Sequence, residues 1–348
     1  MRLERVVPGR RPPPGLEGAI LTRDLAVAGE RWSMGRRRPG ADLRALAAAP
    51  PGHPVSVLIP DADEIHEDAA ALRLATAVTG GDPGVTLRGP AQSRVDLVAA
   101  VPGVVAVRLA ALERVNRLDP LEVFTVFDGQ VVEAGTIIAA VKVGPHLVRD
   151  EVLLAGEAIA RRGGPLVRVR PFRATRIAVL VKEHIAGAAR ERFEASVRAK
   201  AAGLGAELAG IDYVPDETAA VTEALGSAVR GPRAARIVLT AGGASTDPAD
   251  PFYLAVSALG GRMVRHGVPS HPGSMLWLGR VGRTAIVGLP SCGAYSKATA
   301  VDLLLPRLVA GEPASAATVA RLAHGGILTR TQRFRFPAYA RDLDAPDG

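Results

Sequence analysis

One loop in the C-terminal half of the chain combines paired glycines with hydroxyl side chains. An apolar run at residues 237–239 leads into Thr240, then into Gly242, Gly243 and Ser245. Paired glycines let a phosphate or a ring approach backbone N–H groups, and the Ser245 hydroxyl adds a hydrogen-bond donor. The pattern indicates a loop that binds an anionic ligand.

Two carboxylates follow in the same loop. Asp247 and Asp250 could hold Mg²⁺ or accept a proton, so we take both as candidate catalytic residues. A structural interpretation stays open beside this one. A loop between a strand and a helix needs glycine for its turn and aspartate to cap the helix, whatever its function.

A second loop follows another apolar run, at residues 284–288. Pro290, Ser291 and Gly293 stand in the turn LPSCG, which leads into a helix whose N-terminal N–H groups could bind an anion. Lys297 lies in the first turn of that helix, where its ammonium group either reaches a phosphate or is solvated. This turn is the second candidate ligand-binding loop.

A glycine turn made by Pro272 and Gly273 lies between the two loops, and His266 and His271 flank it. Either histidine contacts a ligand there or has no role in binding. Cys292 is the single cysteine, which excludes a disulfide framework and a cysteine-based structural zinc site. Its thiol either contacts a bound metal or is an inert small side chain.

The elements that must position these loops alternate regularly between residues 171 and 312. We expect strands at residues 176–181, 206–214, 237–240, 263–268, 275–281 and 284–288, and helices at residues 188–204, 217–229, 252–259 and 295–308. Such alternation predicts an α/β fold in which helices cover both faces of a mostly parallel sheet. In an open sheet of this kind ligands bind beyond the carboxyl ends of the strands, where both loops begin.

The rest of the chain does not show this regular alternation of strands and helices. Residues 1–170 read as an irregular β-rich region, with one clear helix that starts near residue 63 and ends at Gly80. A hairpin is expected around a tight turn at Asp128 and Gly129. Residues 313–348 form a basic tail without a clear period. We therefore expect three regions, with boundaries near residues 170 and 312.

The amino-acid composition limits the kinds of partner that the protein is expected to bind. The chain has 348 residues, of which 48% are hydrophobic, 22% charged and 4% aromatic, with a net charge of +8. So few aromatics argue against a single-strand nucleic-acid binder, and the basic residues form no periodic stripe, so no nucleic-acid partner is expected. The sequence shows neither a signal-peptide-like start nor 18 successive apolar residues. We expect a cytoplasmic protein with no membrane association and a small anionic ligand.

The order of the loops resembles the molybdopterin-binding domain shared by molybdopterin molybdotransferases (MoeA and the gephyrin E domain), molybdopterin adenylyltransferases and competence-damage proteins. The similarity covers about 140 residues and rests on the run from Thr240 to Asp250, the turn at Gly273, the turn after Leu289 and a closing helix ending near Gly311. Residues 18–21 and 65–70 resemble, more loosely, the accompanying region of MoeA-like proteins.

The resemblance implies a three-layer domain whose ligand is molybdopterin, free or adenylylated, and a homodimer. Gly242, Gly243 and Ser245 would cradle the pterin phosphate, and Asp250 would be the metal ligand that positions Mg²⁺ or molybdate. The other cofactor-binding candidates come from the matching strand end and turns. They are Thr240, Pro272, Gly273, Pro290, Ser291, Gly293 and Lys297.

Departures from the family pattern leave three functions open. The loop at residues 182–187 lacks the family's aspartate, and Ser274 stands where the family has a lysine. The leading hypothesis is assistance in inserting molybdate into molybdopterin. The second is a non-catalytic carrier that delivers the cofactor to the apoprotein of a molybdenum enzyme, and the third is a nucleotide pyrophosphatase like the competence-damage proteins.

Overall fold

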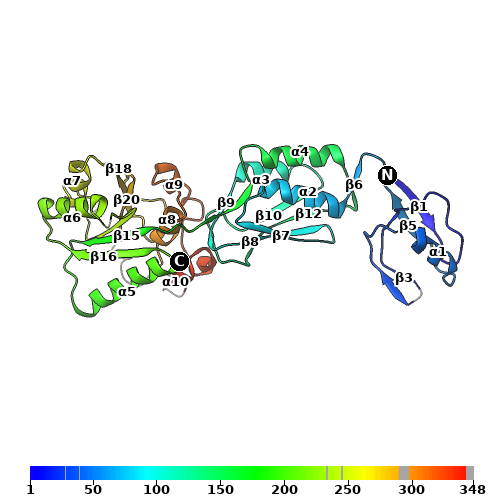
Figure 1. The fold of residues 1–348 in the computed structure, drawn as a ribbon, viewed down its shortest axis with the longest axis horizontal. Coiled ribbons are helices and arrows are strands. Elements are labelled where there is room, and N and C mark those ends of the chain that lie inside the picture. Colours follow the sequence, from blue (N-terminus) through cyan, green and yellow to red (C-terminus); the bar gives the residue numbers. More distant parts are fainter. Residues whose placement is uncertain (28, 39, 233, 244–245, 290–297, 342–348) are drawn as a thin grey trace. The chain divides into compact units, whose positions relative to one another are not determined.

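The structure is a computed structural model that describes residues 1–27, 29–38, 40–232, 234–243, 246–289 and 298–341. The chain divides into two compact units (Figure 1). Unit 1 comprises Met1–Ala100, Ala106–Val126 and Ala134–Arg168, and unit 2 comprises Val101–Val105, Phe127–Glu133 and Val169–Gly348. Among the described residues, no helix combines the length and the apolar character needed to cross a membrane.

Unit 1 consists of small antiparallel sheets and short helices, which confirms the β-rich expectation. Its strands are β1 (Arg2–Val6), β2 (Ile20–Leu21), β3 (Leu25–Val27), β4 (Glu30–Trp32), β5 (Val55–Ile59), β6 (Glu64–His66), β7 (Val85–Ala91), β8 (Arg94–Ala99), β10 (Leu121–Thr125), β12 (Ile137–Val143) and β13 (Leu147–Arg149). Its helices are α1 (Gly40–Ala48), α2 (Glu67–Thr79), α3 (Leu109–Val115) and α4 (Asp150–Arg161). The strands pair in the orders β1-β5-β2, β10-β12-β8-β7, β13-β6 and β3-β4.

Helix α2 packs against β7, β8 and β12 of the four-stranded sheet. Ala70, Leu74 and Val78 recur at helical spacing and are fully buried, so one apolar stripe faces the sheet. The helix ends as expected at Gly80, whose φ of +56° suits glycine. It begins later than expected, because Glu64–His66 pairs with β13 as a strand.

The turn at Asp128 and Gly129 forms, with Gly129 at a φ of +83°. The strands on its two sides do not pair with each other. Instead β10 pairs with β12, while β11 (Val131–Val132) pairs with β9 (Gly103–Val107) in a sheet of order β11-β9-β14 that β14 (Val167–Pro171) completes. Glycine fixes the local turn, whereas the partner of each strand depends on long-range packing.

Unit 2 is built on a six-stranded sheet of order β16-β15-β17-β20-β19-β18. Its elements are β15 (Arg176–Val181), α5 (Gly187–Gly203), β16 (Glu207–Tyr213), α6 (Thr218–Arg230), β17 (Ile237–Ala241), α7 (Pro251–Ala258), β18 (Arg262–Arg265), β19 (Trp277–Val281), β20 (Thr284–Gly288) and α8 (Ala300–Val309). The first four strands of the sheet order run parallel, and β19 pairs antiparallel with both β20 and β18. The α/β expectation is confirmed.

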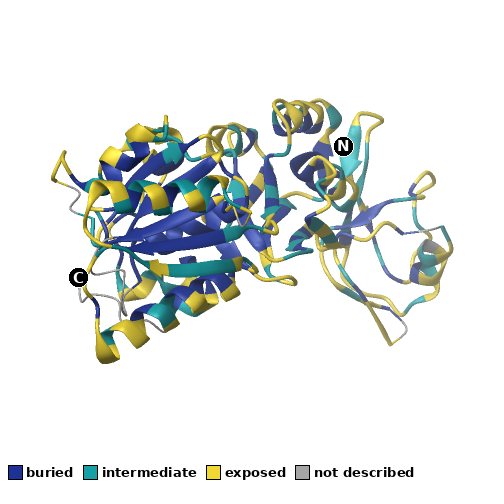
Figure 2. Ribbon diagram, turned by 60° about the vertical axis from the view of Figure 1, so that its left-hand side comes forward, coloured by how far each residue is buried: buried dark blue, intermediate teal, exposed yellow. Residues whose placement is uncertain are grey.

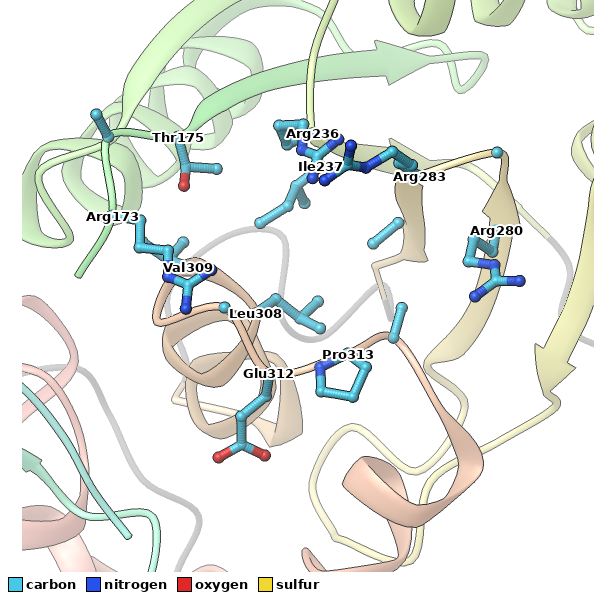
Figure 3. Close-up of a pocket in the computed structure, with 15 residues that line it drawn as sticks. Arg173, Thr175, Arg236, Ile237, Arg280, Arg283, Leu308, Val309, Glu312 and Pro313 are labelled. Carbon is cyan, nitrogen blue, oxygen red and sulfur yellow. The ribbon is translucent and has the colours of Figure 1, made fainter. Parts of the chain in front are cut away.

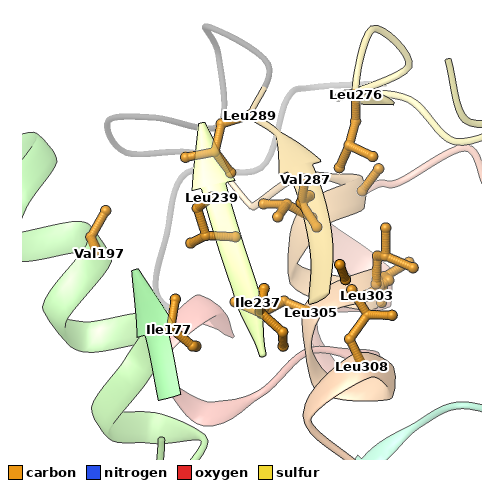
Figure 4. Packing of buried hydrophobic residues seen from close by; sticks show 14 of the residues in the cluster. Ile177, Val197, Ile237, Leu239, Leu276, Val287, Leu289, Leu303, Leu305 and Leu308 are labelled. Atoms are coloured by element: carbon orange, nitrogen blue, oxygen red, sulfur yellow. The ribbon is translucent and has the colours of Figure 1, made fainter. Parts of the chain in front are cut away.

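Alternate residues of the central strands face two different helix layers. Ile177 and Leu239 pack with α5 and α8, as Figure 4 shows, whereas Leu180 and Val238 pack with α6 and α7. Successive side chains of a strand point to opposite faces, so continuous apolar runs bury both faces of the sheet. Figure 2 shows these buried strands between helices whose outer faces are exposed.

The C-terminal part of unit 2 also contributes to its core. Helix α8 begins at Ala300, later than the expected residue 295, because Thr299 caps it in a capping box with Asp302. After α8 the chain forms α9 (Ala316–Ala320), the 3₁₀ helix η2 (Arg330–Arg335) and α10 (Ala338–Arg341). Val319, Leu328 and Phe336 of this segment are buried against the α5–α8 side of the sheet.

Candidate functional site

Polar side chains gather where the parallel strands of unit 2 end. Lys182 follows β15, Asp216 follows β16, and Gly242 and Gly243 follow β17. The loop after β17 runs to Asp250, which caps α7. We call this region the carboxyl edge of the sheet. It is where ligands of open parallel sheets bind.

A buried ion pair joins two loops of the carboxyl edge. Nζ of Lys182 lies 3.0 Å from Oδ2 of Asp250 and 2.7 Å from Oδ1 of Asp216. The side chains of Lys182 and Asp250 are 4% and 1% exposed, whereas that of Asp216 is 61% exposed. The backbone N–H of Phe252 donates a hydrogen bond of 2.9 Å to Oδ1 of Asp250. Both carboxylate oxygens of Asp250 are thus engaged.

The charge of Lys182 follows from its partners. Burial acts to lower the pKa of its ammonium group, but the hydrogen bonds to Asp216 and Asp250 outweigh burial and raise this pKa above its usual value. The ammonium group is therefore charged at neutral pH. Its positive charge is balanced by the carboxylates of Asp216 and Asp250.

Thr240 carries a buried hydroxyl for which the described residues offer no hydrogen-bond partner. Val238, two residues earlier, faces the α6–α7 layer, so Thr240 faces it too. Gly288 pairs with Thr240 on one side and with Trp277 on the other. A Cβ at position 288 would lie 1.8 Å from Nε1 of Trp277, so glycine there lets the indole cross β20 toward β17.

Tyr253, in the first turn of α7, supplies a second buried hydroxyl without a partner among the described residues. Burial, together with the negative charges of Asp250 and Asp247, raises the pKa of this phenol to about 12. The phenol therefore keeps its proton at neutral pH and can donate a hydrogen bond. Its ring packs edge-on against Trp277 and His266, at centroid distances of 5.1 and 5.3 Å.

The two glycines after β17 have different environments. Gly242 has a φ of +89°, and a Cβ there would lie 2.6 Å from Cβ and 2.7 Å from the backbone nitrogen of Glu183. A Cβ on Gly243 would meet only ordinary contacts, 3.4 Å from Phe252 and from Nε1 of Trp277. Gly242 is therefore required by the turn itself, whereas a methyl group at position 243 would fit against its neighbours without a clash.

Two other predicted site residues belong to a turn that positions α8. Gly273 has a φ of +104°, and a Cβ there would lie 2.8 Å from the backbone nitrogen of Ala300. The N–H of Ala300 also donates a 3.0 Å hydrogen bond to the carbonyl of Pro272. The conformation of the Pro272 and Gly273 turn is thus explained by its contact with the first residue of α8.

The structure brings together part of the predicted site. Thr240, Gly243 and Asp250 lie around Trp277 and the start of α7, while Asp247 is exposed and accepts a 2.9 Å hydrogen bond from the N–H of Ala249. The remaining candidates lie outside the described residues: Ser245, Pro290, Ser291, Gly293 and Lys297, together with Cys292.

A comparison with known protein families identifies one segment of unit 2. Residues 176–310 match the model of a family described as "probable molybdopterin binding domain". This segment belongs to that family. The resemblance inferred from the order of the loops is thereby confirmed for the molybdopterin-binding domain, which coincides with the sheet of unit 2 and the helices around it.

Two solved structures are similar to parts of the chain. MoaB from Thermus thermophilus, described as a molybdopterin biosynthesis enzyme, is 24% identical over 40% of this chain and 99% of its own, with a TM-score of 0.29. A MoeA protein from Pyrococcus horikoshii, described as a molybdopterin biosynthesis protein, is 14% identical over 74% of this chain and 80% of its own, with a TM-score of 0.31. No curated protein matches the chain.

The molybdopterin-binding domain does not offer Mg²⁺ a ligand set among its described residues. No three histidine, cysteine, aspartate or glutamate side chains in the described part of the chain group closely enough to hold a metal ion. Oδ2 of Asp250 contacts the ammonium group of Lys182, and Oδ1 accepts a hydrogen bond from the backbone N–H of Phe252. As arranged, these described donors do not fit Mg²⁺, and Asp250 as its ligand stays a prediction.

Three side chains of this domain were not among the residues predicted from the sequence. Lys182 was passed over because we looked for an aspartate in its loop, although its position directly after β15 was a usable signal. Tyr253 and Trp277 lie in a predicted helix and a predicted strand and were not singled out; only the packing of α7 on β19 shows that their rings meet and that Trp277 borders Gly243. Aromatic side chains at such positions carry no distinguishing sequence pattern.

Proposed function

We propose that the protein binds molybdopterin, free or adenylylated, at the carboxyl edge of unit 2, and that it acts in the assembly of the molybdenum cofactor. The match of residues 176–310 to the molybdopterin-binding family carries this proposal. The buried hydroxyls of Thr240 and Tyr253, which have no hydrogen-bond partner among the described residues, support it independently. Buried polar groups without a partner are uncommon in native proteins, and a bound ligand can supply the missing hydrogen bond.

Each group has a distinct part in this proposal. The ammonium of Lys182 ties the two loops together through Asp250 and Asp216, and these two carboxylates balance its charge. The phenol of Tyr253 donates a hydrogen bond, since its raised pKa keeps the proton in place. Gly243, which is only partly buried, offers its backbone N–H to the ligand.

Molybdate insertion with Mg²⁺ is the activity that the family resemblance implies, with Asp250 and Asp247 as its acidic residues. The Lys182–Asp250 pair favours the second function, a carrier that holds the cofactor for the apoprotein of a molybdenum enzyme. Placing Mg²⁺ on Asp250 would bring a divalent cation beside the Lys182 ammonium, and like charges repel strongly at a buried site. We therefore propose the carrier as the function that this geometry supports best.

The experiment separates binding from chemistry. Purified protein is titrated with molybdopterin and with its adenylylated form, and AMP release is followed after molybdate and Mg²⁺ are added. Tight binding without AMP release supports the carrier. AMP release that is lost in Asp250→Asn would instead establish insertion, and absence of binding to wild-type protein would refute the whole proposal. Hydrolysis of ADP-ribose would indicate the pyrophosphatase, and the molar mass of the same preparation tests the homodimer.

A further inference from the structure

A second cavity lies at the opposite edge of the unit 2 sheet. Its volume is ≈ 450 Å³, and it is lined by residues just before β15 and β17, by the turn between β19 and β20, and by the end of α8. These are the amino ends of the parallel strands, so the sheet separates this cavity from the carboxyl edge. A volume of several hundred Å³ suits a small molecule.

Four arginines line this cavity: Arg173, Arg236, Arg280 and Arg283. Figure 3 shows Arg236 and Arg283 side by side on one rim and Arg173 across the opening, beside Val309. None of the four forms an ion pair with a carboxylate of the described residues, in contrast to many other arginines of unit 2. Neighbouring like charges without a counterion repel each other, so an anion is favoured between them.

Glu312 is the one acidic residue in the described lining, and its charge is already balanced. Its carboxylate, 1% exposed, lies 3.1 Å from Arg170, 3.1 Å from Arg307 and 3.4 Å from Arg321. Three guanidinium groups thus surround a single carboxylate. Glu312 has no negative charge left over for the four arginines of the cavity.

The end of α8 does not occupy these arginines either. The last carbonyls of the helix, from Pro306 to Val309, accept hydrogen bonds from backbone N–H groups at Ala310, Glu312, Gly311 and Arg173. The guanidinium groups of the cavity are therefore available to a ligand. The guanidinium fork matches the oxygens of a phosphate, and several forks together suit more than one phosphate group.

The floor of the cavity is apolar. Ile237 and Leu308 line it together with Pro313, and Figure 3 shows these side chains among the arginines of the lining. An inorganic anion would leave such a surface uncovered, whereas an organic phosphate would cover it. Burial of apolar surface adds affinity in proportion to its area.

We propose that this cavity is a binding site for a small organic diphosphate, held by Arg236 and Arg283 with Arg173 opposite. The proposal does not depend on the function of the carboxyl edge, since all its residues lie at the other end of the strands. Arg236 and Arg283 also border a neighbouring cavity of ≈ 490 Å³, lined by the ends of α6 and α7, which offers room for the organic part.

Binding of ADP and of inorganic pyrophosphate to the full chain tests the proposal, by calorimetry at physiological ionic strength. We expect ADP to bind with a Kd below about 1 mM and about 10-fold more tightly than pyrophosphate. The Arg236→Ala/Arg283→Ala variant should weaken ADP binding by about 10-fold or more. Arg192→Ala, at an exposed position of α5, is the matched control and should bind like wild type.

Two further outcomes separate this site from the carboxyl edge. Gly243→Ala at the carboxyl edge, which meets only ordinary contacts, should leave ADP binding unchanged; if it abolishes binding while the double arginine variant binds normally, the proposal is wrong. Pyrophosphate that binds as tightly as ADP would overturn the assignment to an organic ligand. Thermal unfolding without ligand shows whether the double variant folds, and Arg236→Lys/Arg283→Lys, which keeps the charge, should retain weaker binding because it loses the fork geometry.

Discussion

The ammonium group of Lys182 lies 3.0 Å from Oδ2 of Asp250, and the two side chains are 4% and 1% exposed. This contact ties the end of β15 to the start of α7 across the loop that follows β17. The pair therefore sets the shape of the carboxyl edge. Removing one member leaves the other charge buried with fewer partners.

Breaking the pair should destabilise unit 2. We expect Lys182→Met to lower the free energy of unfolding by about 3 kcal/mol, since it strands the buried Asp250 carboxylate. Asp250→Asn should cost less, because its oxygen can still cap α7 and Lys182 keeps Asp216. Urea unfolding followed by Trp277 fluorescence in a Trp32→Phe background checks both, as these are the two tryptophans of the chain. Additive effects in the double variant would contradict the pairing.

Alkaline pH should destabilise unit 2 through Tyr253. Its pKa is raised to about 12, mainly by burial, so the folded state holds the proton more firmly than the unfolded state, where the pKa is about 10. The contribution of Tyr253 to the free energy of unfolding is fully present below pH 10. It falls by roughly 3 kcal/mol in all as the pH rises toward 12. Lys182, whose pKa is also raised, acts in the same direction.

Tyr253→Phe isolates that contribution. Melting temperatures measured from about pH 8 to pH 11 should fall more steeply in wild type than in this variant, because the unfolded-state pKa of tyrosine lies in that interval. Parallel curves would show that the phenol titrates as it does in the unfolded chain.

Removing a buried hydroxyl that has no partner among the described residues should stabilise the fold and lower the affinity for the ligand. We expect Thr240→Val to raise the free energy of unfolding by about 1 kcal/mol, because a buried group without a partner is replaced by a methyl. Affinity for molybdopterin should fall about 10-fold. Thr284→Val is the matched control, since Oγ1 of Thr284 donates a 2.8 Å hydrogen bond to the carbonyl of Ala235. It should destabilise the fold and leave binding intact.

The two glycines after β17 should respond differently to alanine. Gly242→Ala combines a positive φ with a backbone clash at Glu183, and should cost about 2 kcal/mol or more. Gly243→Ala meets only contacts of 3.4 Å, and should change stability by less than about 1 kcal/mol. It should nevertheless weaken molybdopterin binding, because the added methyl lies in the loop that we propose contacts the ligand. Equal stability of the two variants would contradict the described loop geometry.

Much of unit 2 follows from the sequence alone. The apolar runs that became β15, β17 and β20 and the helices between them have local signals of length, periodicity and glycine stops, so their existence and order could be predicted. The same order of loops carried the resemblance to the molybdopterin-binding family. Such signals lie within a few residues of each other along the chain and need no knowledge of packing.

The tertiary structure decided which side chains meet. Lys182 and Asp250 are 68 positions apart, and only the parallel pairing of β15 with β17 brings their loops together. Trp277 reaches the carboxyl edge because β19 turns back beside β20 and Gly288 leaves room for the indole. Arg236 and Arg283 likewise come from separate strand ends. Contacts of this kind depend on strand order and register, which local sequence patterns do not encode.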